Sequence, residues 1–225
     1  MTAHFVTLLD QLRRRSLRMA SHVEDIVQEA VESVFTADES LARRVITRDA
    51  EVDNDEVEVE AEVIRLMALY QPVGSDLRLL CTVLKVNSDL ERISDCAVNI
   101  AERARHLEVQ ALATRNATLQ QMCPLVRRLL RNAIHAYSME DGEVARKLRE
   151  QDDEIDECYA NIVKQIIRDA AADSGQMAGY LDVLSVAKNL ERLADHAINI
   201  AEEVIYLTTG TIIRHQGSDP EHAKS

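Results

Sequence analysis

Residues Leu90–Glu102 read LERISDCAVNIAE, and 100 positions later Leu190–Glu202 read LERLADHAINIAE. Nine of the thirteen positions are identical, and the differences include the conservative change from Ile93 to Leu193. Similarity at a fixed spacing within one chain is typical of a duplicated structural unit. Two copies are too few for a solenoid, so we expect a molecule built from two related halves.

The repeat extends upstream of this motif. Leu41–Asp53, LARRVITRDAEVD, matches Val144–Asp156, VARKLREQDDEID, at a spacing of 103 residues. The difference of three residues falls between the two motifs, where the turn YQPVGS at 70–75 faces the shorter DSGQ at 173–176. Because proline and glycine interrupt helices, these segments are expected to connect the second and third helices of the units.

The composition favours helices, and the net charge argues against one class of partner. The 225 residues include only 6 Gly, 3 Pro and no Trp, and aromatic residues make up 3%. A formal net charge of −13 argues against nucleic acid as a partner, because such binding relies on clustered Lys and Arg. The N-terminal stretch does not resemble a secretion signal, and no apolar run approaches the roughly 18 residues of a membrane span. We therefore expect a cytoplasmic protein.

The hydrophobic pattern predicts an all-α fold of two tandem three-helix bundles related by the duplication, with six long helices. These helices are expected at His4–Phe35, Asp38–Leu69, Asp76–Leu107, Thr118–Ser138, Gly142–Ala172 and Met177–Thr208. Along the chain we expect a first bundle at 1–108, a linker at 109–117, a second bundle at 118–209 and a flexible tail at 210–225.

The third helix of each unit carries apolar residues at alternating spacings of four and three. In the first unit this seam comprises Leu79, Val83, Val86, Leu90, Ile93, Ala97, Ile100, Ala104 and Leu107. Its duplicate comprises Val183, Val186, Leu190, Leu193, Ala197, Ile200, Val204 and Leu207. Such a heptad seam indicates neighbouring helices that pack nearly antiparallel, crossing at about 20°. Ser75 is the expected N-cap of the first of these helices.

The four cysteines are dispersed along the chain and form no CxxC pair. They are Cys81, Cys96, Cys123 and Cys158. This pattern favours reduced thiols in the core over a disulfide framework or a thiolate zinc site.

Four acidic pairs with the spacing acid-x-x-x-Asp recur at matching positions in the two units, two in each unit. They are Asp49/Asp53, Glu91/Asp95, Asp152/Asp156 and Glu191/Asp195. Residues four apart on a helix are neighbours, with Cβ atoms roughly 5–6 Å apart. On the third helix the acidic residues point almost opposite the apolar seam, so we expect the carboxylates on an outer face. An isolated pair is usually a solvated helix face, but four matched pairs favour two cation sites.

Carboxylates that face one another repel. With an effective dielectric constant near 20, two charges about 6 Å apart interact by roughly 3 kcal/mol, so a cluster favours cation binding or protonation. Arg92 and Arg192 are expected to point about 100° away from the neighbouring glutamates, which makes a metal ion the better neutraliser. An all-oxygen ligand set suits magnesium, manganese or iron(III), with zinc possible.

Further oxygen ligands are conceivable at the edges of these sites. The candidates are Asn99, Asn199, Glu102 and Glu202. His196 follows Asp195, but its counterpart is Cys96 and its direction differs from the acidic stripe by about 100°. We expect His196 to be packed or solvated and not to be a ligand.

The segments LERISDCAVNIAERA, LERLADHAINIAEEV and YQPVGSDLR resemble the PhoU family, and the resemblance covers Met1–Thr209 in order. It implies two three-helix bundles, surface clusters of iron, zinc or other divalent ions, homodimers and no enzymatic activity. Carried over to this chain, it implies one metal site from Asp49, Asp53, Glu91 and Asp95. It implies a second metal site from Asp152, Asp156, Glu191 and Asp195.

The resemblance also implies a negative regulator and adaptor of phosphate uptake and phosphate-regulon signalling. The expected partners are the ATPase of the phosphate ABC transporter and the sensor histidine kinase, whose signal is held off when phosphate is plentiful. Membrane contact would be peripheral, through these partners. Asp replaces Glu at the first position of the pairs Asp49/Asp53 and Asp152/Asp156, which shortens the reach of the ligand and leaves the metal and its number open.

Three other interpretations stay open. By the same resemblance, the chain would serve a different phosphate permease. A carboxylate di-iron or ferritin-like enzyme would place inward-facing Glu beside Glu-x-x-His motifs, but no His in this chain has Glu three residues before it. A purely structural bundle would bind no metal, and replacing Glu91 and Asp95 by amides would then change nothing.

Overall fold

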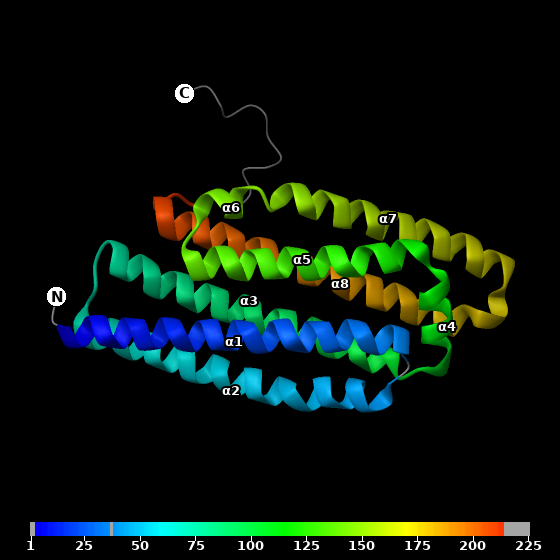
Figure 1. Cartoon of the computed structure of the whole chain (residues 1–225), viewed down its shortest axis with the longest axis horizontal. Helices are drawn as coiled ribbons and strands as arrows, with labels where there is room; N and C mark the ends of the chain where they lie inside the picture. Colours follow the sequence, from blue (N-terminus) through cyan, green and yellow to red (C-terminus); the bar gives the residue numbers. More distant parts are fainter. Residues whose placement is uncertain (1–2, 37, 214–225) are drawn as a thin grey trace, which may run out of the picture.

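The computed structural model describes residues 3–36 and 38–213. These residues form eight α-helices, one 3₁₀-helix and no strand (Figure 1), so the predicted all-α fold is confirmed. In chain order the elements are α1 (Ala3–Thr36), α2 (Glu39–Tyr70), α3 (Ser75–Ala104), α4 (Leu107–Arg115), α5 (Ala117–Met139), α6 (Gly142–Arg146), α7 (Arg149–Ala172), the 3₁₀-helix η1 (Ser174–Gln176) and α8 (Met177–Thr209).

The chain folds into two three-helix units that follow the repeat. The first contains α1, α2 and α3, and the second contains α5, α8 and the pair α6 and α7. The middle helix of each unit begins at an equivalent aspartate. Asp38 Oδ1 accepts backbone N–H groups two and three residues further on at 2.9 and 3.1 Å, and Asp141 Oδ1 does the same at 2.9 and 3.0 Å. The duplication therefore includes the N-caps.

The middle helix of the second unit is interrupted, so the single helix predicted at Gly142–Ala172 is wrong in this respect. Between α6 and α7 the N–H groups of Lys147 and Leu148 bond to carbonyls three residues back, at 3.1 and 3.2 Å. Such bonds tighten the chain into a 3₁₀-like turn. The turn places Leu148, which is 1% exposed, in the core.

The connection between the units is also helical. The predicted linker at 109–117 largely coincides with α4, and the third helix ends at Ala104, before the predicted Leu107. The side chains of Val109 and Ala113 are fully buried in the core, which explains why this segment packs as a helix. Of the tail predicted at 210–225, only the part up to residue 213 belongs to the described residues.

The turn before α3 also differs from the prediction. Ser75 is the first residue of α3 and not its N-cap, a position that Gly74 takes without a side-chain hydrogen bond. Gly74 has a φ of 61°, a left-handed conformation that costs glycine little. The glycine of the YQPVGS turn therefore determines how the chain enters α3.

The two units pack against each other antiparallel through α3 and α8, which share the most extensive contact between any two described elements (Figure 1). Lys85 Nζ, early in α3, lies 3.1 Å from Glu203 Oε1, late in α8. At the other end, Arg103 Nη1 lies 3.5 Å from Asp182 Oδ1. Each third helix thus contacts its own duplicate in reverse, and α1 contacts α5 as well.

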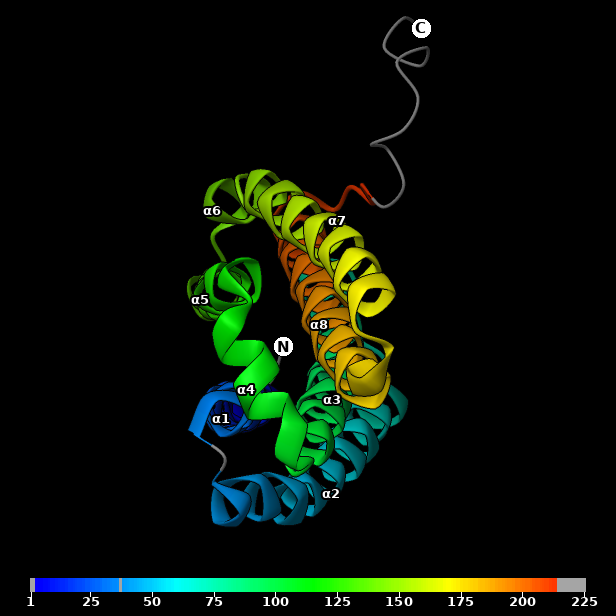
Figure 2. The ribbon, with the colours of Figure 1, turned by 90° about the vertical axis from the view of Figure 1, so that its right-hand side faces the viewer.

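This pairing produces a two-layered molecule. In Figure 2 the helices α2, α3, α8 and α7 follow one another along one side, and α1 and α5 lie on the other, linked to the rest by α4. The contacts agree, because α2 packs on α3, α3 on α8 and α8 on α7. The helices that carry the acidic pairs therefore belong to one continuous layer.

The predicted seams form the centre of the core. Leu90, Ile93, Ala97 and Ile100 and their four duplicates are all 0% exposed. One hydrophobic cluster runs through both units without a break, joining side chains of α1 to α5, α7 and α8. At the start of α3 the fully buried residue is Leu80, and the predicted Leu79 is only partly buried. The two bundles therefore share one core.

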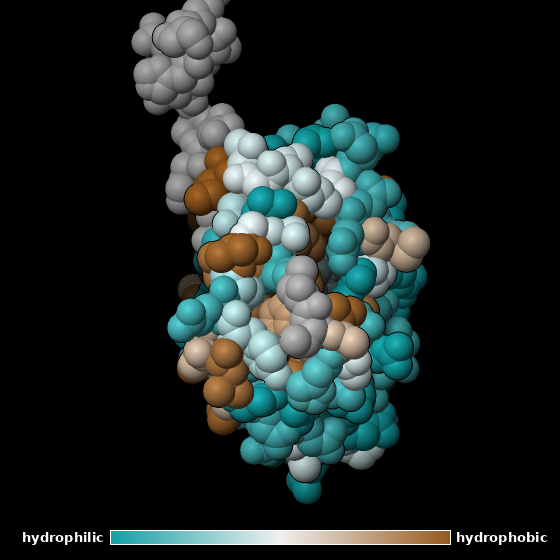
Figure 3. All heavy atoms as spheres, turned by 90° about the vertical axis from the view of Figure 1, so that its left-hand side faces the viewer, coloured by the Kyte–Doolittle hydropathy of each residue, from teal (hydrophilic) through white to brown (hydrophobic). Residues whose placement is uncertain are grey.

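A second, smaller hydrophobic cluster closes the end of the first unit that carries the α2–α3 turn. This end faces the viewer in Figure 3, where hydrophobic surface alternates with hydrophilic surface. Leu69 and Val73, near the turn, are 64% and 78% exposed. Among the described residues, no helix combines the length and apolarity needed to cross a membrane.

All four cysteines are free thiols, and three of them are buried. Burial raises the pKa of Cys96 to about 11 and that of Cys123 to about 12. Both thiols are therefore protonated at neutral pH and poorly nucleophilic. This agrees with the prediction of reduced core cysteines.

We expect Ile93→Ala to lower the free energy of unfolding by about 3 kcal/mol, because it removes a fully buried side chain and leaves a cavity. Because both units share one core, far-UV circular dichroism and tyrosine fluorescence should report a single, coincident transition in denaturant. The control is Ile64→Ala on α2, where the side chain is 54% exposed and the expected loss is below about 0.5 kcal/mol. Equal effects of the two changes would contradict this account of the core.

Candidate metal centres

The first acidic cluster joins α2 and α3. Asp49 and Asp53 come from α2, one turn apart, and Glu91 and Asp95 come from α3. Burial raises the pKa of Asp49, and the charges of Asp53 and Asp95 raise it further. A hydrogen bond of 2.6 Å from Ser94 Oγ to Asp49 Oδ1 acts in the opposite direction and lowers this pKa. Burial is also the main cause of the raised pKa of Glu91, and the charge of Asp95 is the next largest cause. The carboxylates of the two helices therefore share one electrostatic site.

Glu56 is part of the same cluster, although the sequence pattern did not single it out. It lies on α2 and is half-buried, three residues after Asp53. Burial raises the pKa of Glu56, and the charges of Glu60 and Asp53 raise it further. Its own charge in turn helps to raise the pKa of Glu91. A search that allowed a spacing of three as well as four would have found it, because both place side chains on one helix face.

The second acidic cluster consists of Asp152 and Asp156 on α7 with Glu191 and Asp195 on α8. Burial raises the pKa of Asp152 to about 7, and the charges of Asp156 and Asp195 add to the shift. Burial is also the main cause of the raised pKa values of Asp156 and Asp195, and Glu191 is the strongest charge acting on each. At neutral pH this cluster therefore attracts a proton or a cation.

Basic side chains already contact both clusters. Arg92 places Nε 3.4 Å from Glu91 Oε2 and Nη1 3.6 Å from Asp95 Oδ2. The expectation that Arg92 points away from the cluster is wrong, because its long side chain folds back along the helix. In the second cluster, Lys188 Nζ lies 2.7 Å from Glu191 Oε2.

The side-chain amides proposed as extra ligands have other partners. Asn99 Nδ2 donates to the backbone carbonyl of Asp95 at 2.9 Å. Asn199 Nδ2 donates to Asp89 Oδ1 at 3.1 Å, across the contact between α8 and α3. His196 Nδ1 lies 3.0 Å from the same Asp89 oxygen, so this histidine is packed against α3, as expected. Asn199 and His196 thus strengthen the contact between the two units.

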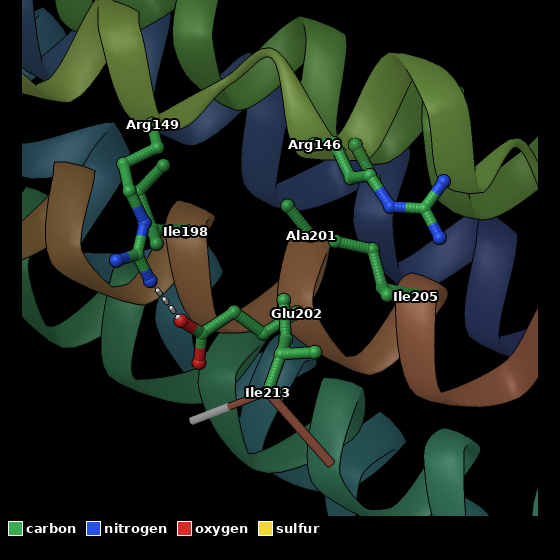
Figure 4. A pocket seen from close by; sticks show the side chains of 8 residues that line it. Arg146, Arg149, Ile198, Ala201, Glu202, Ile205 and Ile213 are labelled. Carbon is green, nitrogen blue, oxygen red and sulfur yellow. Dashed lines mark hydrogen bonds and ion pairs between the residues drawn. The ribbon is translucent and has the colours of Figure 1, made fainter. Parts of the chain in front are cut away.

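The two additional glutamates differ in their surroundings. Glu102 is exposed on α3. Glu202 lines a cavity of about 250 Å³ between α6, α7 and α8, where its Oε1 pairs with Arg149 Nη2 at 2.9 Å (Figure 4). Arg146 borders the same cavity, and the figure shows its guanidinium directed away from Glu202. Glu202 therefore ties α8 to the start of α7.

The donor groups of both clusters suit hard cations, since they are all carboxylate oxygens. Within residues 3–36 and 38–213, however, no group of three or more His, Cys, Asp or Glu side chains is already arranged to hold a metal ion. Ser94, Arg92 and Lys188 each contact a carboxylate of the clusters. The residues are of the type that binds hard cations, but their carboxylates do not converge on one point in this arrangement.

In the presence of a chelator, Asp152→Asn should stabilise the protein at pH 8 and have little effect at pH 4. Folding raises the pKa of Asp152 from 3.8 to about 7, so the ionised carboxylate destabilises the folded state progressively as the pH rises through this interval. After a discount for partial exposure, we expect a gain of about 1–2 kcal/mol at pH 8. Thermal unfolding at both pH values measures it, with exposed Glu157→Gln on α7 as the control. A gain independent of pH would contradict the assignment.

The same two units are found when the chain is compared with known proteins. A family model described as the PhoU domain matches residues 16–104 and again residues 119–204. A relative from Pseudomonas putida, named phosphate-specific transport system accessory protein PhoU homolog, is 34% identical over 210 residues, which cover 93% of this chain and 82% of the relative. A relative of the same name from Aquifex aeolicus is 34% identical over 208 residues, covering 92% and 94%.

Solved structures agree with the sequence relatives. The crystal structure of PhoU from Pseudomonas aeruginosa matches with a TM-score of 0.87 and 31% identity, covering 92% of this chain and 100% of that one. The phosphate transport system regulatory protein PhoU from Streptococcus pneumoniae matches with a TM-score of 0.83 and 27% identity, covering 92% and 98%. Since the family model spans both units and relatives above 30% identity match over most of their length, this chain belongs to the PhoU family.

Proposed function

We propose that this protein is a non-enzymatic accessory protein of phosphate transport that acts as an adaptor and negative regulator. It connects the ATPase of a phosphate ABC transporter with the sensor histidine kinase of the phosphate regulon and keeps the kinase signal low when phosphate is plentiful. The observation that carries the proposal is the similarity, over about nine-tenths of the chain, to proteins named phosphate-specific transport system accessory proteins. The adaptor works in the cytoplasm as a homodimer and reaches the membrane only through its partners.

The two acidic clusters are the proposed metal centres of the adaptor. Asp49, Asp53, Glu91 and Asp95 would hold ions at the first cluster. Asp152, Asp156, Glu191 and Asp195 would hold ions at the second. Iron, zinc, magnesium and manganese are the candidates, and a bound ion would supply positive charge between two neighbouring helices. Because the clusters are partly exposed, such an ion would also be within reach of an acidic group on a partner.

The distribution of buried charge favours this adaptor over a di-iron enzyme. Ferritin-like sites gather carboxylates inside the bundle, beside histidines. In the described part of the chain, Glu203 is the one carboxylate residue that is fully buried, and it pairs with Lys85. The interior between the helices is filled by the shared apolar core. The acidic residues of the clusters instead lie at the partly exposed outer side of the helix layer.

Deletion of the gene should raise expression of a phosphate-regulated reporter in medium rich in phosphate, because the kinase signal is no longer held low. Tagged protein isolated from cells grown in phosphate should co-purify with the transporter ATPase and the sensor kinase. Co-purification with a different phosphate permease would instead favour the accessory role there. Unchanged reporter expression together with neither partner in the isolate would refute the adaptor function.

Protein purified without chelators should contain metal in stoichiometric amounts, as measured by elemental mass spectrometry. The double variant Glu91→Gln, Asp95→Asn should lose the share bound at the first cluster, because carboxylates are replaced by weaker, neutral ligands. Removal of metal by a chelator should lower the melting temperature of the wild type, since a ligand that binds only the folded state stabilises it.

The matched control for this experiment is Glu51→Gln. Glu51 is exposed and lies on α2 between the two aspartates of the first cluster, so it tests the general effect of removing acidic charge. Metal content should be retained in this variant. Loss of metal in the control to the same degree as in the double variant would contradict the assignment of the site.

A further inference from the structure

The outer face of α2 carries an exposed apolar seam. This helix packs on α1 and α3 and lies at one end of the helix layer (Figure 2). On its opposite face lie four exposed residues that we call the outer seam: Val57, Ala61, Ile64 and Ala68. Val57 is 62% exposed and Ile64 is 54% exposed. Single exposed apolar residues are common, but spacings of four, three and four are typical of a helix that packs against another helix.

The second unit does not repeat the outer seam. At the spacing of 103 residues, Ala61 in the middle of the seam corresponds to Lys164, and Val57 corresponds to the smaller Ala160. The other two positions are apolar in both units. Lys164 is exposed, as expected for a helix face in contact with water. The continuous outer seam is therefore a feature of the first unit alone.

A second copy of α2 fits the outer seam when the two helices run antiparallel. If the two-fold axis passes midway between Ala61 and Ile64, then Ala61 lies level with Ile64 of the second copy. Val57 then lies level with Ala68 of the second copy. Each layer combines a small side chain with a larger one, and each contact occurs twice, as a two-fold interface requires. A parallel pairing would set Ala61 against Ala61 and leave a gap.

The charges on one flank of the outer seam are complementary in this antiparallel register. Glu58 and Arg65 lie one heptad apart on the same flank, so each Glu58 lies beside Arg65 of the second copy. Their side chains are 58% and 45% exposed. Within the chain, Glu58 contacts Arg15, and Arg65 contacts Glu62 at 2.6 Å. Both charges nevertheless remain at the surface, where a second copy can reach them.

Other registers would bring like charges together. On the second flank, Glu60 lies beside the uncharged Met67 of the second copy in the register described. A shift by one heptad would place Glu58 beside Glu58 and Glu60 beside Glu60, and the opposite shift would place Arg65 beside Arg65. A parallel pair would bring Asp53 beside Glu58. One antiparallel register therefore satisfies both the apolar layers and the flanking charges.

We propose that the outer seam of α2 is the contact surface for a second copy of this chain in a reversible antiparallel dimer. The inference rests on the homodimer of the proposed function and names its surface. The seam spans only about 17 Å of helix, and each copy carries a net charge of −13, which opposes association. The dimer should therefore dissociate on dilution.

Sedimentation equilibrium of the full chain at several concentrations, in the presence of a chelator, tests this surface. Ile64→Glu should weaken dimerisation at least about tenfold, because it places a carboxylate within the apolar contact. The matched control is Ile167→Glu at the corresponding position of α7, where the side chain is 64% exposed. This control should leave dimerisation unchanged. Both variants should keep the melting temperature within a few degrees of the wild type, because both positions are exposed.

Exchange of the flanking charges tests the register. Arg65→Glu and Glu58→Arg should each weaken the dimer, because each leaves like charges side by side. The double variant Glu58→Arg, Arg65→Glu should regain much of the affinity, because both ion pairs form again with reversed polarity. Double variants that dimerise no better than the single variants would overturn the register.

Oxidative cross-linking tests the direction of the two helices. Val57→Cys protein mixed with Ala68→Cys protein should form a disulfide-linked dimer, since these positions lie level in the antiparallel pair. Val57→Cys alone should not, because its two copies lie about 17 Å apart along the helices. The wild type controls for the native thiols. A dimer linked by Val57→Cys alone would overturn the antiparallel arrangement.

The outcomes distinguish this inference from the proposed function. A dimer that Ile64→Glu leaves intact would refute the outer seam as its surface, and the proposed homodimer would stand on another face. A wild type that stays monomeric at every concentration would refute both the seam contact and the homodimer. If such a monomer lost the transporter ATPase or the sensor kinase on Ile64→Glu, the seam would belong to a partner protein and the inference would be wrong.

Discussion

The antiparallel packing of α3 against α8 is the contact on which the rest of the molecule depends. Each of these helices buries its heptad seam in a core that belongs to both units. Polar contacts fix the register between them: Lys85 with Glu203, and Asp89 with Asn199 and His196. If α3 slid along α8, the buried carboxylate of Glu203 would lose its ion pair with Lys85, which would cost stability. The ion pair therefore helps to fix the register of the two helices. The two repeats are therefore two halves of one folding unit.

The same packing determines where the acidic clusters lie. Since the seams of α3 and α8 face the core, the opposite faces turn toward the outside, where α2 and α7 flank them. Carboxylates from neighbouring helices are then held close together although they repel, because the apolar core fixes the helices and the carboxylates cannot move apart without disturbing it. Burial raises the pKa of Asp49 and of Asp152, and the charges of the neighbouring carboxylates add to both shifts.

The duplicated sequence gives the molecule two acidic clusters at matching positions, and the residues that surround them differ. The caps at Asp38 and Asp141 and the seams have stayed alike, because they determine folding. The residues around the carboxylates differ: Arg92 contacts Glu91 and Asp95 in the first cluster, and Lys188 contacts Glu191 in the second. Membership of the PhoU family accounts for the shared scaffold of the two units.

Much of the fold was predictable from local pattern. The repeat, the heptad seams and the acid-x-x-x-Asp pairs are periodic features that a helix translates directly into faces, so the all-α class and the long helices could be inferred from spacing. The break at Lys147 and Leu148 and the helix α4 were not predictable, because both depend on burying side chains against a core formed by distant segments. Glu56 was missed because the pattern considered only pairs that end in Asp at a spacing of four.

The sequence by itself determined the helices, their apolar faces and the eight carboxylates, since these depend on residues a turn or two apart. The pairs Arg92–Asp95 and Lys188–Glu191 are three residues apart on one helix, so the spacing already allowed them. Only the tertiary structure decided which duplicate packs on which, and that the Tyr159 ring of α7 lies beside Lys188 of α8. These contacts join segments that are far apart in the chain, and no spacing along one helix contains that information.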